Sequence, residues 1–531
     1  MVKKILAAGW VGLGLAQTAA WADVKLPAIL SHNMVVQAGK TVPVWGTADA
    51  GETVTVTLAG QTQAATADAN GKWMVKFSPV PPGNLGEMTV AGNNTLAVKN
   101  ILAGSVWVCS GQSNMQFGMS TAHNAATELP RAQYPKMRLF TVANAIAFKP
   151  KTDCGGRWVE CTPETAKGFS AVAYFFGREL HIASGQPVGL IHASWGGTPA
   201  QSWVSLDGLD KDNALKDAYG DPFRNTMETM PQLKEKYVRE TLPNYEEQVK
   251  KWQEDAKKAK DEGRNPPPAP FKPGAPDQGP GTSMLYNSMI APLIPYAIAG
   301  VIWYQGEANA GKAVLYRTLF PRLISDWREK WGQGDFPFFF VQLANYEKRA
   351  TVPTGIGAWN WPLLREAQTM TLKLPNTGMA VTIDIGEEDI HPKNKMEVGR
   401  RLALWAEKKV LGKDVVCSGP LYSGMKIEDG KVRLSFTEIG GGLVIGAAPA
   451  IWADALLAQP LPDLKGFAIA GEDQAWVWAD AKIDGNSIVA WSDKVAKPVA
   501  VRYAWAFNPE CNLYNREGLP ASPFRTDDWI K

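Results

Sequence analysis

The chain has 531 residues, of which 45% are hydrophobic and 20% are charged, and its formal net charge is +3. This length predicts roughly two to four domains, and the composition is typical of a globular protein rather than a disordered one. The small net charge gives no electrostatic reason to expect a nucleic acid partner.

The first residues have the pattern of a secretion signal. Lys3 and Lys4 precede an apolar run that ends at Leu15, and Ala20-Trp21-Ala22 follows as a cleavage site of the small-x-small type. The apolar run is too short to span a membrane comfortably. We therefore predict that residues 1–22 are a signal peptide, and that the mature protein is periplasmic or secreted with no membrane partner after cleavage.

The five cysteines predict at most a small number of disulfides. Export permits disulfide formation, and Cys154 and Cys161 are close enough in sequence to pair across a short loop. Cys109 lies in an apolar run and is expected to be a buried small residue. No cysteine or histidine spacing indicates a metal site, so we expect no metal.

Two regions of short alternating strands flank the middle of the chain. Residues 23–100 contain Thr53–Leu58, in which apolar and polar residues alternate, and predict a small β domain. Residues 411–531 contain a similar run at Lys431–Phe436 and predict a C-terminal β region. This region can pack on the N-terminal β domain, because chain termini often lie close together.

Residues 101–410 alternate between buried strands and helices, which predicts an α/β domain with a doubly wound parallel sheet. The expected strands are Ser105–Val108, Pro187–His192, Ala299–Trp303, Phe336–Gln342 and Met379–Ile383. The expected helices are Ala171–Ser184, Tyr316–Lys330 and Trp361–Leu372.

An insertion at about 205–282 interrupts this alternation. Lys234–Lys260 is highly charged, and a proline- and glycine-rich stretch follows it to Gly281. These features predict an exposed helix or helical hairpin and then a stiff, extended loop. The insertion either shapes the rim of a cleft or is a solvent-exposed segment without a function.

Four polar clusters directly follow predicted strands, so the sheet should bring them to one edge, where open α/β sheets bind ligands. They are Gly111–Met115, His192–Thr198, Trp303–Asn309 and Asp384–Pro392.

These clusters contain the groups that acyl-ester hydrolysis requires. Ser113 is the candidate nucleophile, and His391 is the candidate base. A carboxylate would orient His391: Asp389 lies two residues before it, Glu388 lies three before it, and Asp384 is a further alternative.

The developing oxyanion needs hydrogen-bond donors. The backbone N–H groups of Ser113 and Gly197 are candidates, the amide of Gln305 is a third, and Asn309 is a weaker one.

Each of these residues also has a purely structural interpretation. A serine after a strand is usually a helix N-cap, and both His192 and Glu307 fit structural roles. Several aromatic residues near the clusters either stack on sugar rings or pack in the core. They are Trp195, Trp303 and Tyr304, the candidate substrate-binding residues, together with Trp203, Trp359 and Trp361.

Taken together, the clusters resemble the SGNH-hydrolase superfamily and, within it, the sialate O-acetylesterase-like carbohydrate esterases. The segments that carry the resemblance are Ser110–Met115, Trp195–Thr198, Ile302–Glu307 and Asp389–Pro392, with further similarity in Leu285–Ile290 and Trp361–Gln368. The resemblance implies an α/β/α hydrolase domain that removes acetyl groups from carbohydrate hydroxyls without a cofactor. It makes Ser113 the nucleophile and His391 the base, and it puts Gly197 and Gln305 at the oxyanion positions.

The sequence departs from the superfamily pattern in two places. Gln305 replaces the usual asparagine, which lengthens the donor arm. The common Asp-x-x-His spacing would put Glu388 at the acid position, whereas the aspartate here is Asp389, one residue nearer to His391. We favour Asp389 as the acid, and a Ser–His dyad helped by a backbone carbonyl is the other arrangement.

The sequence therefore favours an exported O-acetylesterase that acts through an acetyl-enzyme intermediate. Acetylated sialic acid and acetylated plant polysaccharides such as xylan or xyloglucan are the candidate substrates. Two alternatives are a lipase or thioesterase on the same fold and a glycan-binding protein with a degenerate site. The sequence indicates no particular oligomeric state.

Overall fold

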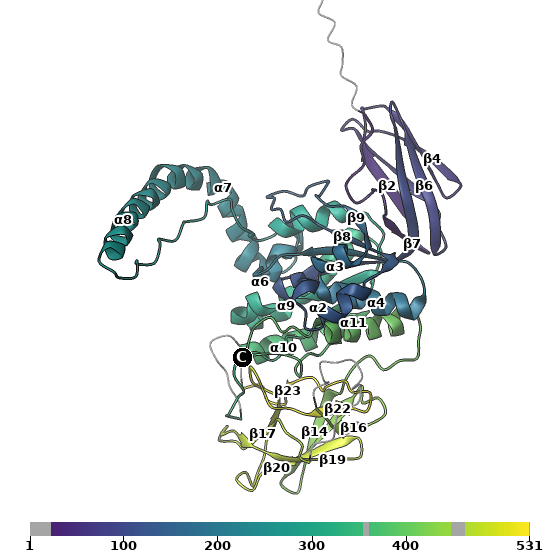
Figure 1. Cartoon of the computed structure of the whole chain (residues 1–531). Helices are drawn as coiled ribbons and strands as arrows, with labels where there is room; N and C mark the ends of the chain where they lie inside the picture. The colour runs from purple at the N-terminus through teal and green to yellow at the C-terminus, as the bar shows by residue number, and fades with distance from the viewer. Residues whose placement is uncertain (1–22, 354–359, 448–461, 530–531) are drawn as a thin grey trace, which may run out of the picture.

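The computed structural model describes residues 23–353, 360–447 and 462–529. Figure 1 shows three parts: an N-terminal β region, a central α/β unit and a C-terminal β region. The predicted signal peptide lies outside the described residues. No helix in the described ranges is long and apolar enough to cross a membrane.

The central unit is built on a mixed sheet, which confirms the α/β class. Its strands lie in the order β13 (Thr377–Ala380), β12 (Phe338–Val341), β11 (Gly300–Tyr304), β7 (Thr95–Gly111), β10 (Val188–Ser194), β8 (Tyr134–Thr141) and β9 (Trp158–Cys161). Every neighbouring pair is parallel except β8 and β9 at the edge. The parallel strands therefore bring their carboxyl ends to one edge, with β7 in the interior of the sheet.

Helices cover both faces of this sheet. Successive side chains of β12 point to opposite faces: Phe339 contacts Trp405 of α11 (Lys395–Lys409), whereas Phe340 contacts Phe320 of α9 (Ala313–Trp331). Helix α4 (Ala171–Ser184) packs against α11, and α10 (Trp361–Met370) packs against α9. The three helices predicted from the sequence are thus confirmed. The remaining helices of the central unit are short: α1 (Ser113–Gln116), α2 (Ala125–Glu128), α3 (Pro163–Lys167), α5 (Leu206–Leu209) and α6 (Asn213–Leu215).

The N-terminal region is joined to the central unit by β7 itself. The first part of β7 pairs with β6, and its last part, Ser105–Gly111, pairs with β10. The predicted boundary at residue 100 therefore falls inside one continuous strand. The other strands of this region are β1 (Val35–Gln37), β2 (Val42–Thr47), β3 (Thr53–Leu58), β4 (Gln61–Thr66), β5 (Lys72–Phe77) and β6 (Gly83–Ala91).

The C-terminal β region lies on the opposite side of the central unit from the N-terminal one (Figure 1), so the expected packing between them is wrong. It docks instead on α10: the buried Arg365 guanidinium donates to the carbonyl oxygens of Ala506 (2.6 Å) and Phe507 (2.9 Å). Its strands are β14 (Leu421–Glu428), β15 (Lys431–Thr437), β16 (Leu443–Ile445), β17 (Phe467–Ala470), β18 (Val477–Trp478), β19 (Asp480–Asp484), β20 (Ser487–Trp491), β21 (Ala500–Tyr503), β22 (Leu513–Asn515) and β23 (Phe524–Arg525).

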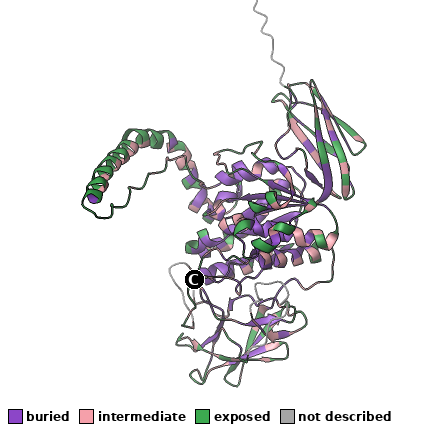
Figure 2. Ribbon diagram, viewed as in Figure 1, coloured by how far each residue is buried: buried purple, intermediate pink, exposed green. Residues whose placement is uncertain are grey.

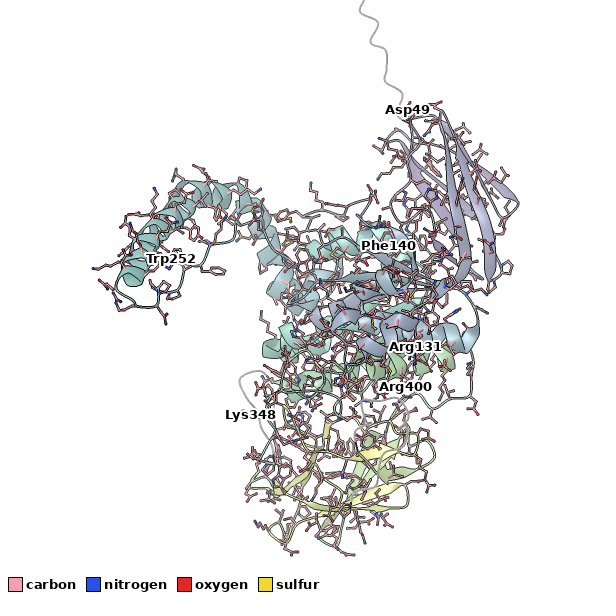
Figure 3. The ribbon with its side chains drawn as sticks, in the orientation of Figure 1. Asp49, Arg131, Phe140, Trp252, Lys348 and Arg400 are labelled. Carbon is pink, nitrogen blue, oxygen red and sulfur yellow. The ribbon has the colours of Figure 1, made fainter. Side chains whose placement is uncertain are left out.

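The insertion forms a long helical arm that projects from the central unit (Figure 1). It contains α7 (Asp221–Lys236) and α8 (Leu242–Asp261). The π-helical turn Tyr237–Thr241 joins them into one continuous helix, so they do not form a hairpin. Most of the arm is exposed (Figure 2). Trp252, labelled in Figure 3, donates its indole N–H to the Pro267 carbonyl (2.7 Å) and ties the returning loop to α8.

All five cysteines are free, so the expected Cys154–Cys161 disulfide is wrong in this structure. Cys161 is the last residue of the extended strand β9, which carries it away from Cys154 in the preceding loop. Its thiol is buried beside the Ala132 carbonyl.

Candidate active site

Ser113 lies where β7 turns abruptly into the short helix α1. The strand ends at Gly111, which has φ of +138° and lies very close to β11. A Cβ atom at Gly111 would lie 2.1 Å from the Tyr304 carbonyl oxygen. Only glycine fits this position, and the turn that it allows presents Ser113 at the carboxyl edge of the sheet.

The sheet edge brings Ser113 and His391 together, although 277 residues separate them in the chain. Ser113 Oγ lies 2.9 Å from His391 Nε2. This is the distance at which a histidine can take the proton of a serine nucleophile.

Asp389 is the carboxylate that contacts His391. Its Oδ1 lies 3.3 Å from His391 Nδ1, and the same oxygen accepts a hydrogen bond from the His391 backbone N–H at 2.7 Å. The Asp389 side chain is 68% exposed, so water screens this contact.

The other two candidate acids do not contact His391 in the described structure. Glu388 is exposed. Asp384 is bound by Arg401 at 2.7 Å and 2.8 Å and also accepts from the Tyr514 hydroxyl. Asp384 therefore has a structural role in a buried ion pair.

Two backbone N–H groups are available for an oxyanion. The Gly196 N–H donates to Gln116 Oε1 of α1 (2.8 Å), which fixes the loop after β10 beside Ser113. Gly197 follows with φ of +73° and is exposed. Within the described ranges, the N–H groups of Ser113 and Gly197 have no hydrogen-bond acceptor.

Gln305 does not point a free donor at Ser113, contrary to the expectation. Its amide nitrogen donates to Asn309 Oδ1 (2.7 Å) and more weakly to the Thr198 carbonyl (3.4 Å). Its amide oxygen accepts from the Tyr316 hydroxyl (2.9 Å). Gln305 is fully buried and holds Asn309, whose Oδ1 in turn accepts from the Ala200 N–H. It positions the neighbouring loop instead of contacting an oxyanion.

Residues 103–260 and 275–407, more than half of the chain, match the family described as carbohydrate esterase, sialic acid-specific acetylesterase. The chain belongs to this carbohydrate esterase family. It is 32% identical to rat sialate O-acetylesterase over 91% of this chain and 90% of the relative. It is 31% identical to the human sialate O-acetylesterase over 95% of this chain and 94% of the relative.

A solved structure is similar over nearly the whole chain. A carbohydrate acetylesterase from Xanthomonas citri shares 34% identity and a TM-score of 0.77, covering 96% of this chain and all of the other. This chain is thus a carbohydrate O-acetylesterase.

Beneath Ser113 and His391 the esterase has a buried polar cluster that the sequence did not reveal. The Asn114 amide nitrogen donates to Glu307 Oε1 (2.6 Å) and to the Ile390 carbonyl (3.0 Å). The Lys395 ammonium, fully buried, donates to Asn114 Oδ1 at 2.5 Å. Asn114 follows Ser113 directly and so was within reach of sequence analysis, whereas nothing in the sequence marks Lys395, since lysines are mostly exposed.

Of the three predicted sugar-binding aromatics, Trp303 and Tyr304 are fully buried in the esterase core, so that expectation is wrong for both. Trp303 stacks on Phe320, and Tyr304 lies over the Lys395 ammonium. Both residues belong to β11, which is covered on its two faces. Trp195 is half-buried in the loop beside Ser113 and remains able to contact a ligand.

The other described aromatic residues that the sequence suggested are buried and cannot contact a ligand. Trp203 and Trp361 are buried. Trp359 lies outside the described residues.

His192 has a structural role in the esterase. Its Nε2 lies 2.5 Å from Ser194 Oγ, and its ring packs edge-on against Phe169. Complete burial lowers the pKa of His192 to about 4, so it is neutral at neutral pH.

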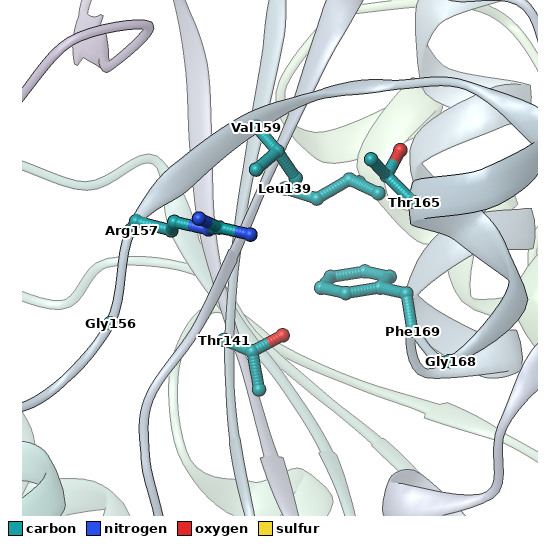
Figure 4. A pocket seen from close by; sticks show the side chains of 8 residues that line it. All are labelled: Leu139, Thr141, Gly156, Arg157, Val159, Thr165, Gly168 and Phe169. Carbon is teal, nitrogen blue, oxygen red and sulfur yellow. The ribbon is translucent and has the colours of Figure 1, made fainter.

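A cavity of about 490 Å³ lies beside the carboxyl end of β8 (Figure 4). Thr141, Arg157 and Phe169 are among its lining residues. Strand β10 separates β8 from β7, so this cavity is distinct from the Ser113–His391 pair. In the part of the chain that the structure describes, no group of three or more histidine, cysteine or acidic side chains could hold a metal ion.

Proposed function

We propose that this protein is an exported serine esterase that removes O-acetyl groups from carbohydrates through an acetyl-enzyme intermediate. The observation that carries the proposal is the 2.9 Å approach of Ser113 Oγ to His391 Nε2. The backbone N–H groups of Ser113 and Gly197, which have no acceptor among the described residues, support it. Membership of the carbohydrate esterase family supports the acetylated carbohydrate as substrate. The N-terminal pattern of residues 1–22 supports export.

The first half of the reaction acylates Ser113. Its Oγ attacks the acetyl carbonyl carbon while His391 Nε2 takes the hydroxyl proton. The N–H groups of Ser113 and Gly197 donate hydrogen bonds to the carbonyl oxygen as negative charge develops on it. The bond to the sugar oxygen then breaks, and His391 gives the proton to that oxygen, which leaves as a free hydroxyl.

The second half releases acetate. A water molecule attacks the acetyl group on Ser113 while His391 takes one of its protons. The Ser113–acetyl bond breaks, and the same proton returns to Ser113 Oγ. Asp389 favours the imidazolium that forms in both halves, and it keeps the His391 ring oriented.

We further propose that the central sheet is the doubly wound SGNH-hydrolase arrangement, with residues 101–410 as the catalytic unit. The strand order supports this, because the strands that follow β7 are added on both of its sides. The substrate is acetylated sialic acid or an acetylated plant polysaccharide such as xylan or xyloglucan. Trp195, half-buried beside the candidate oxyanion loop, is the aromatic side chain best placed to contact the sugar.

The test is acetate release by the purified mature protein from a panel of esters. The panel contains O-acetylated sialic acid, acetylated xylo-oligosaccharides, acetylated xyloglucan and a medium-chain acyl ester. We expect acetate from at least one glycan, and Ser113→Ala should lose activity by several orders of magnitude with unchanged thermal unfolding. Cleavage of the medium-chain ester alone would favour a lipase. No cleavage of any ester would favour a glycan-binding protein.

A further inference from the structure

A cavity of about 590 Å³ lies in the C-terminal β region, apart from Ser113 and His391. Strands β17 to β20 supply most of its wall, and Figure 1 shows β17, β19 and β20 on the side of this region that faces away from the central unit. The volume is in the range of natural ligand sites. The tryptophans and charged residues that line the cavity are Trp478, Trp491, Asp463, Asp480, Glu510 and Lys465.

The two tryptophans give this cavity an apolar wall that is open to solvent. Trp478 of β18 is 43% exposed, which is unusual for so large an apolar side chain. Its indole has no ring contact and no hydrogen-bond partner in the described structure. Trp491 is half-buried at the end of β20, and the Lys431 ammonium lies 4.9 Å from its ring centroid. The Trp478 ring is therefore free to stack on a ligand.

Strand pairing places a carboxylate beside one of these rings. Asp480 of β19 lies directly opposite Trp491 of β20 in the antiparallel register, so both side chains project from the same face of this strand pair. Trp478 is held in the same way, because β18 pairs with β17 and sets it opposite Ala468. The lining side chains thus stand on hydrogen-bonded strands, as a pre-formed binding site requires.

The charged side chains in the lining are mostly acidic. Asp463, Asp480 and Glu510 contribute carboxylates, whereas Lys465 contributes an ammonium that lies 3.7 Å from Asp463. Asp480 and Glu510 make no ion pair and accept no hydrogen bond through their side chains in the described structure. Free carboxylates accept hydrogen bonds from hydroxyl groups. They also repel a ligand that carries carboxylates of its own.

This combination of groups suits a sugar, because the apolar face of a sugar ring stacks on an indole while its hydroxyls donate to carboxylates. We propose that the cavity is a second glycan-binding site, which holds an uncharged polysaccharide chain while Ser113 and His391 act on its acetyl groups. The link to catalysis rests on the proposed serine esterase function. The acidic lining selects xylan or xyloglucan over acetylated sialic acid as the substrate.

Binding of unacetylated polysaccharide tests the site without any need for turnover. Native gels are cast with xyloglucan, with arabinoxylan or with polysialic acid, and the mobility of the mature protein is compared with that in a plain gel. We expect at least one of the two uncharged polysaccharides to retard the protein. No retardation by either of them, or a retardation by polysialic acid that depends on Trp478, would overturn the proposal.

Trp478→Ala and Trp491→Ala should each raise the dissociation constant for the retarding polysaccharide about tenfold or more, because each removes a tryptophan contact. Trp478 is exposed, so its replacement should leave thermal unfolding unchanged. The matched control is Phe271→Ala, which removes a 90% exposed ring from the returning loop of the helical arm. It should be retarded like the wild type. Retardation of Trp478→Ala equal to that of the wild type would contradict the proposal.

Kinetics connect this site to ester cleavage. Trp478→Ala should raise KM for acetylated xyloglucan or xylan about fivefold or more, because an anchored chain presents its acetyl groups at a higher effective concentration. It should change kcat/KM for a small activated acetyl ester less than about twofold. Equal losses on the polymer and on the small ester would overturn the proposal.

The esterase function is tested separately by Ser113→Ala. This variant should lose ester cleavage and still be retarded by the polysaccharide. Retardation of a wild type that cleaves no ester would refute the esterase function and support the glycan site, so the two failures are distinguishable.

Discussion

The Asp389 carboxylate contacts His391 from the solvent side, and this position limits how strongly its charge can stabilise the His391 imidazolium. Its oxygen accepts from the backbone N–H of His391 and lies 3.3 Å from the ring nitrogen Nδ1. Because the side chain is largely exposed, water screens its charge. The sequence favoured Asp389 as the acid, and the structure puts its carboxylate beside His391, but the sequence could not show that this side chain is exposed.

We therefore expect Asp389→Asn to lower kcat/KM by only about tenfold, much less than loss of a buried orienting aspartate. Glu388→Gln should change it less than about twofold, since Glu388 makes no contact with His391 in the described structure. Steady-state kinetics on one acetylated glycan measures both. Equal losses in the two variants would contradict the assignment of Asp389.

Sequence patterns singled out Ser113 and His391 because each follows a strand in a polar cluster, and the structure puts their side chains 2.9 Å apart. They misplaced Gln305, Trp303 and Tyr304, whose chemical types suit an oxyanion donor and sugar-stacking rings. All three side chains are buried by packing against segments far away in the chain. Depth below the surface is a property of the assembled layers, so local residue types do not encode it.

Strand β10 also shows that local sequence does not reveal how deeply an element is buried. The sequence predicted the strand and the polar cluster after it, but the strand is buried on both faces, and His192 is buried with it. A neutral histidine in this position makes the stability of the fold depend on pH.

The pKa of His192 is lowered to about 4 in the folded protein and is near 6.5 in the unfolded chain. Between these values only the unfolded chain binds the proton, so the free energy of unfolding should decrease as pH falls from about 6.5 to 4. The contribution of His192 to this decrease is about 3 kcal/mol. Urea unfolding of the wild type and His192→Gln at several pH values measures it as a difference between the two proteins.

The matched control for this prediction is His32→Gln, since His32 is exposed in the N-terminal region. It measures how far the loss of an exposed imidazole changes the free energy of unfolding. A constant difference between His192→Gln and the wild type from pH 7 to pH 4 would show that the buried imidazole does not carry the effect.

The whole molecule shows which large-scale features the sequence encodes. Alternation of buried strands and helices predicted the α/β unit, and the change to short alternating strands predicted both flanking β regions. The side on which each region docks was not predictable, because docking depends on surfaces that form only after folding. Arg365, fully buried under the C-terminal region, belongs to a helix whose sequence gives no sign of that interface.

Long elements of the fold hold Ser113 and His391 at the carboxyl edge of the central sheet. Strand β7 runs from the N-terminal region to Gly111, just before Ser113, and α11 begins just after His391 and packs directly against α4 on one face of the sheet. The reacting pair is thus fixed between rigid elements, as a pre-organised site requires.

The most direct test of the account is to trap the acetyl-enzyme. The protein is mixed with an activated acetyl ester, quenched with acid within the first turnovers, and examined by intact mass and peptide mapping. We predict one added acetyl group on the peptide that contains Ser113, and none in Ser113→Ala. An acetyl group on another residue, or turnover without any acetylated protein, would contradict the assignment of Ser113 as the nucleophile.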